Sequence, residues 1–265
     1  MKIGFLQFEP LLGKPSETIE GCEALIQRAP EFEVLVLPEL ANSGYNFRDG
    51  EEAGRAAEVP EESPFVAMLQ RQARDRGALL VSGFCEREGN LVFNSSVAVD
   101  GGGIVARYRK IHLFGREKVC FSPGPAAPEV FSWKGVRLGI LVCFDWIFPE
   151  VWRILALQKA DVVCHPSNLV LPGLAQRGVP IHALMNRFYV VTANRIGTER
   201  ELTFTGNSLI ADPRGELLAS ATKDEVALKV VEVDLEKARD KRVTEFNDVL
   251  GDRRPELYGQ LTEAR

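Results

Sequence analysis

The sequence has 265 residues, 45% of them hydrophobic and 26% charged, which is the balance of a globular protein long enough to bury one large core. Its net charge of -5 comes from acidic and basic residues interspersed along the chain. This pattern argues against a nucleic-acid-binding surface and against a basic membrane-binding face, so a small-molecule partner fits better.

The chain begins with an apolar run that we interpret as a strand, because charge and proline interrupt it too early for the core of a signal peptide. Further short runs rich in Val, Ile, Leu and Phe recur along the chain. In order, the predicted strands cover residues 2–8, 33–38, 78–84, 91–99, 103–109, 136–143, 161–165, 188–194, 207–212 and 226–233. Several are apolar almost throughout, which indicates a sheet buried between two layers.

Helical patterns alternate with these strands. The predicted helices cover residues 16–29, 64–76, 149–159, 179–187 and 234–242. Ser63 can cap the second helix with Pro64 at its first position, and Pro149 with Glu150 suits the first turn of the third. Turn signals such as Gly89-Asn90 add hairpins, so the predicted class is α/β with a mixed sheet or sheets.

No apolar run approaches the roughly 20 residues that a membrane-spanning helix requires. We therefore expect a cytoplasmic protein. Five cysteines cannot all pair within one chain, and none lies in a close C-x-x-C pair, so we expect reduced thiols.

No repeat, low-complexity tract or linker divides the sequence, and residues 1–265 are therefore predicted to form one domain. From residue 243 to 265 the pattern weakens into a polar tail with isolated apolar residues. These are Phe246, Leu250, Leu257 and Tyr258. Such a tail is either frayed or packs on another surface through those side chains.

Three reactive residues follow predicted strands directly, namely Glu39, Lys110 and Cys143. The carboxyl ends of strands are where α/β sheets present functional groups. A thiol needs a neighbouring base to form a thiolate near neutral pH, and Glu39 could supply it. Lys110 could then stabilise an oxyanion together with the backbone N–H of Phe144, which follows the nucleophile.

Each of the three residues also has a simpler explanation when it is taken alone. Glu39 could be a carboxylate at a helix start, Lys110 a surface cation and Cys143 a buried core thiol. Their common position at strand ends favours a shared site without establishing it.

Three blocks of sequence around these residues resemble the carbon-nitrogen hydrolase (nitrilase and amidase) superfamily, in the same order along the chain. The matching blocks are Leu37 to Leu40 for the glutamate, Tyr108 to Phe114 for the lysine, and Cys143 to Trp146 with Phe148 to Glu150 for the cysteine. Shorter matches include 115–118, 121–124, 165–168, 186–187, 192–195 and 206–208. The resemblance therefore covers nearly the whole chain, which is especially similar to the compact archaeal-type members.

The resemblance implies a four-layer α-β-β-α sandwich that forms homodimers, with the C-terminal tail packing on the partner subunit. It also implies Cys143 as nucleophile, Glu39 as general base and Lys110 as oxyanion stabiliser, with a thioester intermediate and release of ammonia. Glu117 matches the family's second glutamate, which positions the substrate or the attacking water. No cofactor and no metal are implied.

The residues after Cys143 bear on the substrate. The Cys-aromatic-Asp and Phe-Pro-Glu pattern resembles amidases and carbamoylases, whereas the compact archaeal-type members also include nitrilases. We therefore expect a small amide, with a small aliphatic nitrile as the close alternative. Tyr45, Trp146 and Asn168 are candidate pocket walls, although Tyr45 and Trp146 could equally belong to the core.

The sequence leaves three other interpretations open. A Cys-His hydrolase could use Cys164 with His165, or Cys143 with His112 or His182; neighbouring residues on a strand face opposite sides, which disfavours the first pair. A non-catalytic binding protein of the same fold is a second interpretation, and the intact Glu, Lys and Cys argue against it. An acyltransferase relative would be expected to carry membrane helices.

Overall fold

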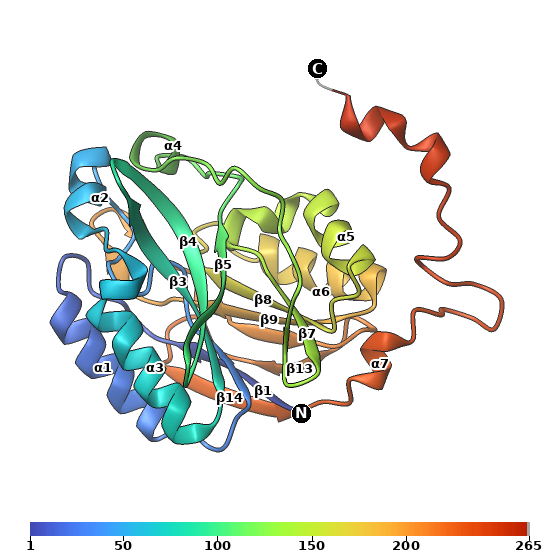
Figure 1. Cartoon of the computed structure of the whole chain (residues 1–265), viewed down its shortest axis with the longest axis horizontal. Coiled ribbons are helices and arrows are strands. Elements are labelled where there is room, and N and C mark those ends of the chain that lie inside the picture. Colours follow the sequence, from blue (N-terminus) through green and yellow to red (C-terminus); the bar gives the residue numbers. More distant parts are fainter. Residues whose placement is uncertain (264–265) are drawn as a thin grey trace.

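The computed structural model describes residues 1–263, and its centre is a pair of stacked six-stranded sheets (Figure 1). The first sheet has the order β14-β1-β2-β3-β4-β5, formed by Ala227–Glu232, Lys2–Gln7, Val34–Val36, Leu79–Glu88, Leu91–Asp100 and Gly103–Arg109. The second has the order β13-β12-β9-β8-β7-β6, formed by Leu217–Ser220, Leu209–Ala211, Tyr189–Asn194, Val162–Ser167, Val136–Ile140 and Phe131–Trp133.

Both sheets are mixed, with three parallel strands at the centre of each. In the first sheet β1, β2 and β3 are parallel, and β14, β4 and β5 extend it by antiparallel pairing. In the second sheet β7, β8 and β9 are parallel, while β6, β12 and β13 pair antiparallel. Because β5 runs parallel to β2, the carboxyl ends of both strands lie at the same edge of the first sheet.

Helices cover the outer face of each sheet. The helices α1 (Pro15–Gln27) and α3 (Pro64–Arg76) pack on the first sheet, and α5 (Pro149–Leu157) and α6 (Leu174–Asn186) pack on the second (Figure 1). The side chain of Ser63 accepts a hydrogen bond from the N–H of Val66, which confirms the predicted cap of α3. The result is the four-layer α-β-β-α sandwich that the resemblance implied.

Side chains on the central strands point alternately into two separate buried clusters. On β2, Val34 and Val36 point into the core between the sheets, whereas Leu35 points toward α1 and α3. The neighbouring β3 behaves in the same way, with Leu79 facing the inner core and Leu80 the outer one. Burial on both faces explains why these strands read as unbroken apolar runs.

All ten predicted strands and all five predicted helices are present, with differences at their ends. The helix α6 begins at Leu174 rather than at residue 179. The sequence did not indicate this earlier start, because the polar Gln176 and Arg177 in the first turn interrupt the apolar pattern. Short elements were not predicted from the sequence. These are β6, β10 (Thr198–Glu199), β11 (Leu202–Thr203), β13, α2 (Gly50–Ala56) and α4 (Glu117–Cys120).

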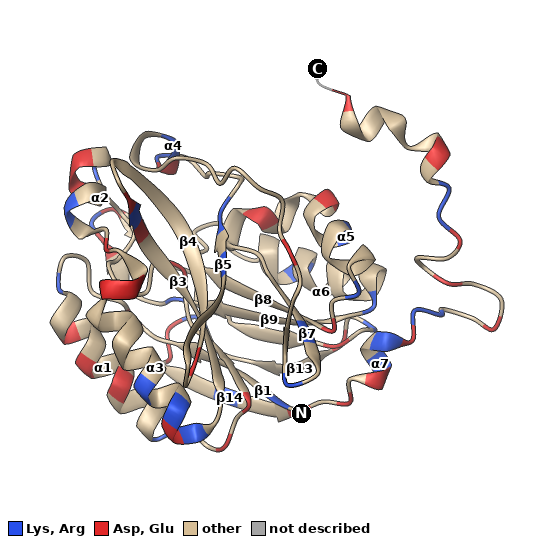
Figure 2. Cartoon of the chain, in the orientation of Figure 1, with Lys and Arg blue, Asp and Glu red and all other residues tan. Residues whose placement is uncertain are grey.

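The C-terminal tail leaves the sandwich after α7 (Glu236–Arg239) and runs beside it as an extended segment with two short 3-10 turns (Figure 1). The last two residues of the predicted tail, 264 and 265, lie outside the described residues. Charges of both signs alternate along the helices and the tail, as Figure 2 shows. Among residues 1–263, no helix combines the length and apolar character needed to cross a bilayer.

Candidate active site

Three of the predicted site residues come together where strands of the two sheets end. Glu39 follows β2, Lys110 follows β5 and Cys143 follows β7. Gly83 of β3 allows the backbone of Glu39 to approach closely, because a Cβ at this position would lie 2.3 Å from the Cα of Glu39. Each side chain is therefore carried by the rigid edge of a sheet.

The ammonium group of Lys110 joins two buried glutamates. Its Nζ donates to Oε1 of Glu39 at 2.7 Å and to Oε1 of Glu117 at 2.8 Å. Lys110 and Glu39 are fully buried, and Glu117 is nearly so. Tyr45 donates its hydroxyl to the same Oε1 of Glu117 at 2.7 Å. The structure thus brings Glu39, Lys110 and Glu117 into direct contact.

The two oxygens of Glu39 have different surroundings. Oε1 accepts hydrogen bonds from Lys110 and, at 2.7 Å, from Nδ2 of Asn94 on β4. Oε2 is buried and has no hydrogen-bond partner within residues 1–263. A buried carboxylate oxygen without a partner is costly in a folded protein and points to a site where something else binds.

Charge in this cluster keeps Lys110 protonated. Burial lowers the pKa of Lys110, but the carboxylates of Glu117 and Glu39 raise it by more, so the net pKa lies above its usual range. Burial raises the pKa of Glu117 and the ammonium of Lys110 lowers it; burial has the larger effect, so the pKa lies above its usual range. The site thus holds a fixed positive charge beside its carboxylates.

Cys143 lies at a sharp turn between β7 and a short 3-10 helix, η2 (Cys143–Ile147). Its φ of 44° is in the left-handed region, which is unusual for a residue other than glycine. Burial raises the pKa of the Cys143 thiol well above its usual range, the Glu39 carboxylate raises it further, and Lys110 opposes both. The resting thiol is therefore protonated and needs a base at the moment of attack.

Asp145 holds this turn from inside η2. Its Oδ2 accepts from the N–H of Val142 and from the hydroxyl of Tyr108, each at 2.9 Å. Its Oδ1 lies 2.8 Å from Nδ1 of His112, whose ring stacks on Phe148. His112 is thus engaged by Asp145. The third histidine of the chain, His182, stacks on Trp152.

The backbone N–H of Phe144 has no acceptor in the hydrogen-bond network of residues 1–263. The carbonyl oxygen of the same peptide, that of Cys143, accepts from Nε2 of His165 at 2.9 Å. A free N–H directly after the thiol is the geometry of an oxyanion-hole donor.

Two adjoining cavities open onto the cluster. One of about 270 Å³ reaches Glu117, and its lining includes Tyr45, Phe114 and Val170. A small one beside it shares Phe114 and Val170 and reaches Cys143; Trp146 and Asn168 line it. The walls of the second cavity are largely apolar, as in many small-molecule sites, whereas Arg116, Glu117 and Glu201 line part of the first.

The predicted pocket residues have additional contacts. Tyr45 holds Glu117 through its hydroxyl. Asn168 donates from Nδ2 to the backbone oxygen of Glu39 at 2.9 Å, while its buried Oδ1 has no partner within residues 1–263. Trp146 packs against Gly178 of α6, where a Cβ would lie 2.6 Å from its ring.

Asn94 contacts the site but was not singled out from the sequence, and His165 was considered there only as a partner of Cys164. The signal for Asn94 was a run of polar residues, Asn94 to Ser96, inside an otherwise apolar strand, all of them buried. His165 gave a weaker signal, as a histidine at the end of an apolar strand. In the part of the chain that the structure describes, no three His, Cys, Asp or Glu side chains are grouped to hold a metal ion.

Comparison with known proteins gives consistent matches along the chain. The family model described as carbon-nitrogen hydrolase matches residues 2–243. A nitrilase from Pyrococcus abyssi is 43% identical over 260 residues, covering 97% of this chain and 99% of that protein. An (R)-stereoselective amidase from a Pseudomonas species is 36% identical over 270 residues, covering 99% and 95%.

Solved structures also match over nearly the whole chain. The crystal structure of an amidase from a Nesterenkonia species superposes with a TM-score of 0.85 at 30% identity, covering 98% of this chain and 96% of that one. A mutant of the Nesterenkonia amidase carries acrylamide added at its active-site cysteine, and it superposes with a TM-score of 0.82 at 29% identity, covering 98% and 99%.

Proposed function

The chain belongs to the carbon-nitrogen hydrolase family, and we propose that it is an amidase that converts a small carboxamide to the acid and ammonia, with Cys143 as nucleophile. One observation carries this proposal. The carboxylate of Glu39 is held through Oε1, while its buried Oε2 has no partner beside a protonated thiol. An oriented base with one free oxygen suits proton transfer from that thiol.

In the proposed reaction, Glu39 takes the proton of Cys143 as the sulfur attacks the amide carbon. The carbonyl oxygen becomes an oxyanion, which the ammonium of Lys110 and the N–H of Phe144 stabilise. When the C–N bond breaks, Glu39 returns its proton to the leaving nitrogen, and ammonia departs. Water then loses a proton to Glu39 and attacks the thioester, which releases the acid and restores the thiol.

Glu117 is proposed to position the substrate amide or the attacking water. Its orientation is well defined, since Lys110 and Tyr45 both donate to Oε1 and the N–H of Phe114 donates to Oε2 at 3.2 Å. Trp146 and Asn168 are proposed to shape the pocket next to the sulfur. The small volume and largely apolar walls of the cavity at Cys143 support a compact, uncharged acyl group.

Nitrile hydrolysis is the second candidate, and one observation favours it. The Pyrococcus abyssi relative, 43% identical over nearly the whole chain, is named a nitrilase. A nitrile would use the same thiolate, which adds to the nitrile carbon, and would also release ammonia. The amidases among the matched sequences and structures support the amide.

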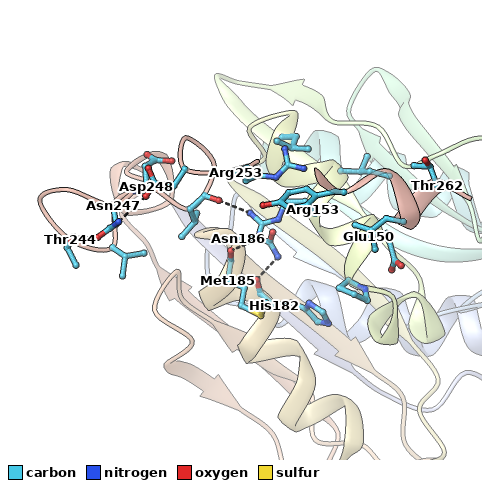
Figure 3. Close-up of a pocket in the computed structure, with 18 residues that line it drawn as sticks. Glu150, Arg153, His182, Met185, Asn186, Thr244, Asn247, Asp248, Arg253 and Thr262 are labelled. Atoms are coloured by element: carbon cyan, nitrogen blue, oxygen red, sulfur yellow. Dashed lines mark hydrogen bonds between the residues drawn. The ribbon is translucent and has the colours of Figure 1, made fainter. Parts of the chain in front are cut away.

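We also propose that the protein forms a homodimer through α5, α6 and the tail. A cavity of about 880 Å³ lies between these helices and residues 243–262 (Figure 3). Arg153 of α5 bridges the two sides by donating to the backbone oxygen of Val249 at 3.3 Å. Exposed apolar side chains border this region, including Met185 on α6 and Phe246 in the tail, which is 85% exposed.

The activity is tested by measuring ammonia release from a panel of small aliphatic amides, carbamoyl compounds and nitriles. We expect wild-type turnover of amides, none with Cys143→Ala, and a loss of about 100- to 10,000-fold with Glu39→Gln, which removes the base. Cys164→Ala is the matched control, because this buried thiol of β8 lies outside the proposed chemistry.

The outcomes separate the candidates. Faster turnover of nitriles than of amides would replace the amidase proposal by the nitrilase one. Absence of turnover on every compound would contradict both. Mass spectrometry of a slow substrate's acyl adduct should place it on Cys143, and an adduct on Cys164 would refute the proposed nucleophile.

A further inference from the structure

The peptide group between Cys143 and Phe144 carries two functions at its two ends. A peptide is planar, so the direction of its C=O fixes the direction of its N–H. The N–H is the proposed oxyanion donor and has no acceptor within residues 1–263, whereas the C=O accepts from Nε2 of His165 at 2.9 Å. Whatever holds this oxygen therefore aims the N–H.

His165 is itself rigidly held. It lies at the carboxyl half of β8 and is fully buried. Its ring packs edge-on against Trp152 with centroids 5.7 Å apart. Thr192, on the neighbouring strand β9, places its Oγ1 3.0 Å from Nδ1 of the imidazole.

The hydrogen-bond partners define one tautomer. A backbone carbonyl can only accept, so Nε2 must carry the proton toward Cys143. Nδ1 then accepts from the hydroxyl of Thr192. Burial lowers the pKa of His165 to about 4, so the ring is neutral near pH 7.

The turn needs such support. Cys143 has a φ of 44°, a conformation that a residue with a side chain adopts only when its surroundings impose it. Asp145 fixes the residue before the thiol through the N–H of Val142. His165 fixes the residue after it, by holding the oxygen of the following peptide.

We propose that His165 is a positioning residue of the oxyanion hole, which acts through the Cys143 carbonyl to aim and polarise the N–H of Phe144. Donation to the C=O of a peptide strengthens the N–H of the same group as a donor. This inference rests on the proposed function, because it assigns a purpose to an N–H that contacts the oxyanion only if Cys143 attacks a carbonyl or related carbon.

The test uses two variants that differ by one methylene. His165→Gln places an amide donor at the position of Nε2, whereas His165→Asn places it at that of Nδ1. We expect His165→Gln to keep kcat for amides within about threefold of the wild-type value. His165→Asn should lose about 10- to 100-fold in kcat, with KM little changed. This loss is smaller than that caused by deleting an oxyanion donor.

A second measurement separates positioning of the N–H from general damage. Methyl methanethiosulfonate modifies Cys143 without forming an oxyanion, so its rate should be the same in both variants and in wild type. Equal kcat in the two variants would overturn the proposal. A loss of thiol modification parallel to the loss of kcat in His165→Asn would also overturn it, since that indicates a displaced sulfur.

Failure of the proposed function would look different, because the wild type would then release no ammonia while thiol modification continued. Should neither His165 variant fold, Thr192→Val replaces them, since it keeps the imidazole and removes the hydroxyl that holds its Nδ1. A lower kcat with unchanged thiol modification then supports the proposal, and an unchanged kcat contradicts it.

Discussion

At the scale of single residues, the site depends on how few donors reach each reactive atom. Asn94 and Lys110 both bind Oε1 of Glu39, which leaves the buried Oε2 without a hydrogen-bond partner within residues 1–263. Burial also keeps the Cys143 thiol protonated until a base removes its proton. The two groups can therefore exchange a proton without first breaking a hydrogen bond to another side chain.

The buried His165 predicts a specific loss of stability in acid. Its pKa is lowered from about 6.5 to about 4 on folding, so the unfolded chain binds a proton that the native protein excludes. The corresponding stability is present above pH 6.5 and is lost as the pH falls from about 6.5 to about 4. Because a tenfold difference in proton affinity corresponds to about 1.4 kcal/mol, the free energy of unfolding should fall by about 3 kcal/mol over this window.

This loss can be measured by urea unfolding of the wild type and His165→Gln between pH 7 and pH 4. Glutamine does not titrate, so the variant should lack this component, while carboxylates that titrate in both proteins cancel in the comparison. Parallel pH profiles for the two proteins would show that the imidazole is not excluded from protonation in the native state.

At the scale of secondary structure elements, the approach of β3 to the residues after β2 positions the proposed base. Gly83→Ala should disturb it, because the new Cβ would lie 2.3 Å from the Cα of Glu39 and 2.4 Å from the nitrogen of Leu40. Neither backbone atom can rotate away. We expect a stability loss of about 1–3 kcal/mol and a fall in kcat of more than about tenfold, from displacement of Glu39.

The matched control makes the same change where there is room. Gly21 lies inside α1, and a Cβ there meets no atom within 4 Å. Gly21→Ala should leave kcat unchanged and raise the free energy of unfolding by about 0.5–1 kcal/mol, since it restricts the unfolded chain. Thermal unfolding and ammonia release measured on both variants would test the steric argument, and full activity in Gly83→Ala would refute it.

The long elements could be predicted from the sequence because their burial leaves a periodic signal. Residues 34–37 are buried on both faces, and their unbroken apolar run indicated this. The hairpin of β10 and β11 gave no such signal. Each strand has two residues, and the hairpin depends on tertiary contacts such as the buried ion pair of Arg195 with Glu199.

The candidate site likewise has a part that the sequence could predict and a part that it could not. Glu39, Lys110 and Cys143 follow strands, so the sequence could predict that they lie together. The contributions of Asn94 and His165 depend on which atom of each side chain meets which oxygen. Such contacts join residues 55 and 22 positions apart, and nothing in the local pattern encodes them.

At the scale of the whole molecule, the sandwich and the tail differ in how they are stabilised. Within residues 1–263, the sandwich contains three clusters of buried apolar side chains and all the residues of the candidate site. In the tail, neither of the two 3-10 turns buries a residue, and Leu257 and Leu261 remain 66% and 67% exposed. The proposed dimer would cover these exposed apolar side chains.

Removal of the tail should therefore weaken self-association more than it weakens the fold. We expect the full chain to be a dimer by light scattering, and a chain ending at residue 243 to dissociate at the same concentration while keeping its helical circular dichroism.

The double variant Leu257→Ser with Leu261→Ser should also weaken the dimer. Burial of a leucine contributes about 1.5–3 kcal/mol, so the dissociation constant should rise more than about tenfold. Leu91→Ser, at an exposed leucine of β4 on the body of the sandwich, is the matched control and should leave the dimer intact. A full-length chain that is monomeric at micromolar concentration, or a truncated chain that dimerises as tightly, would show that the tail covers its own subunit instead.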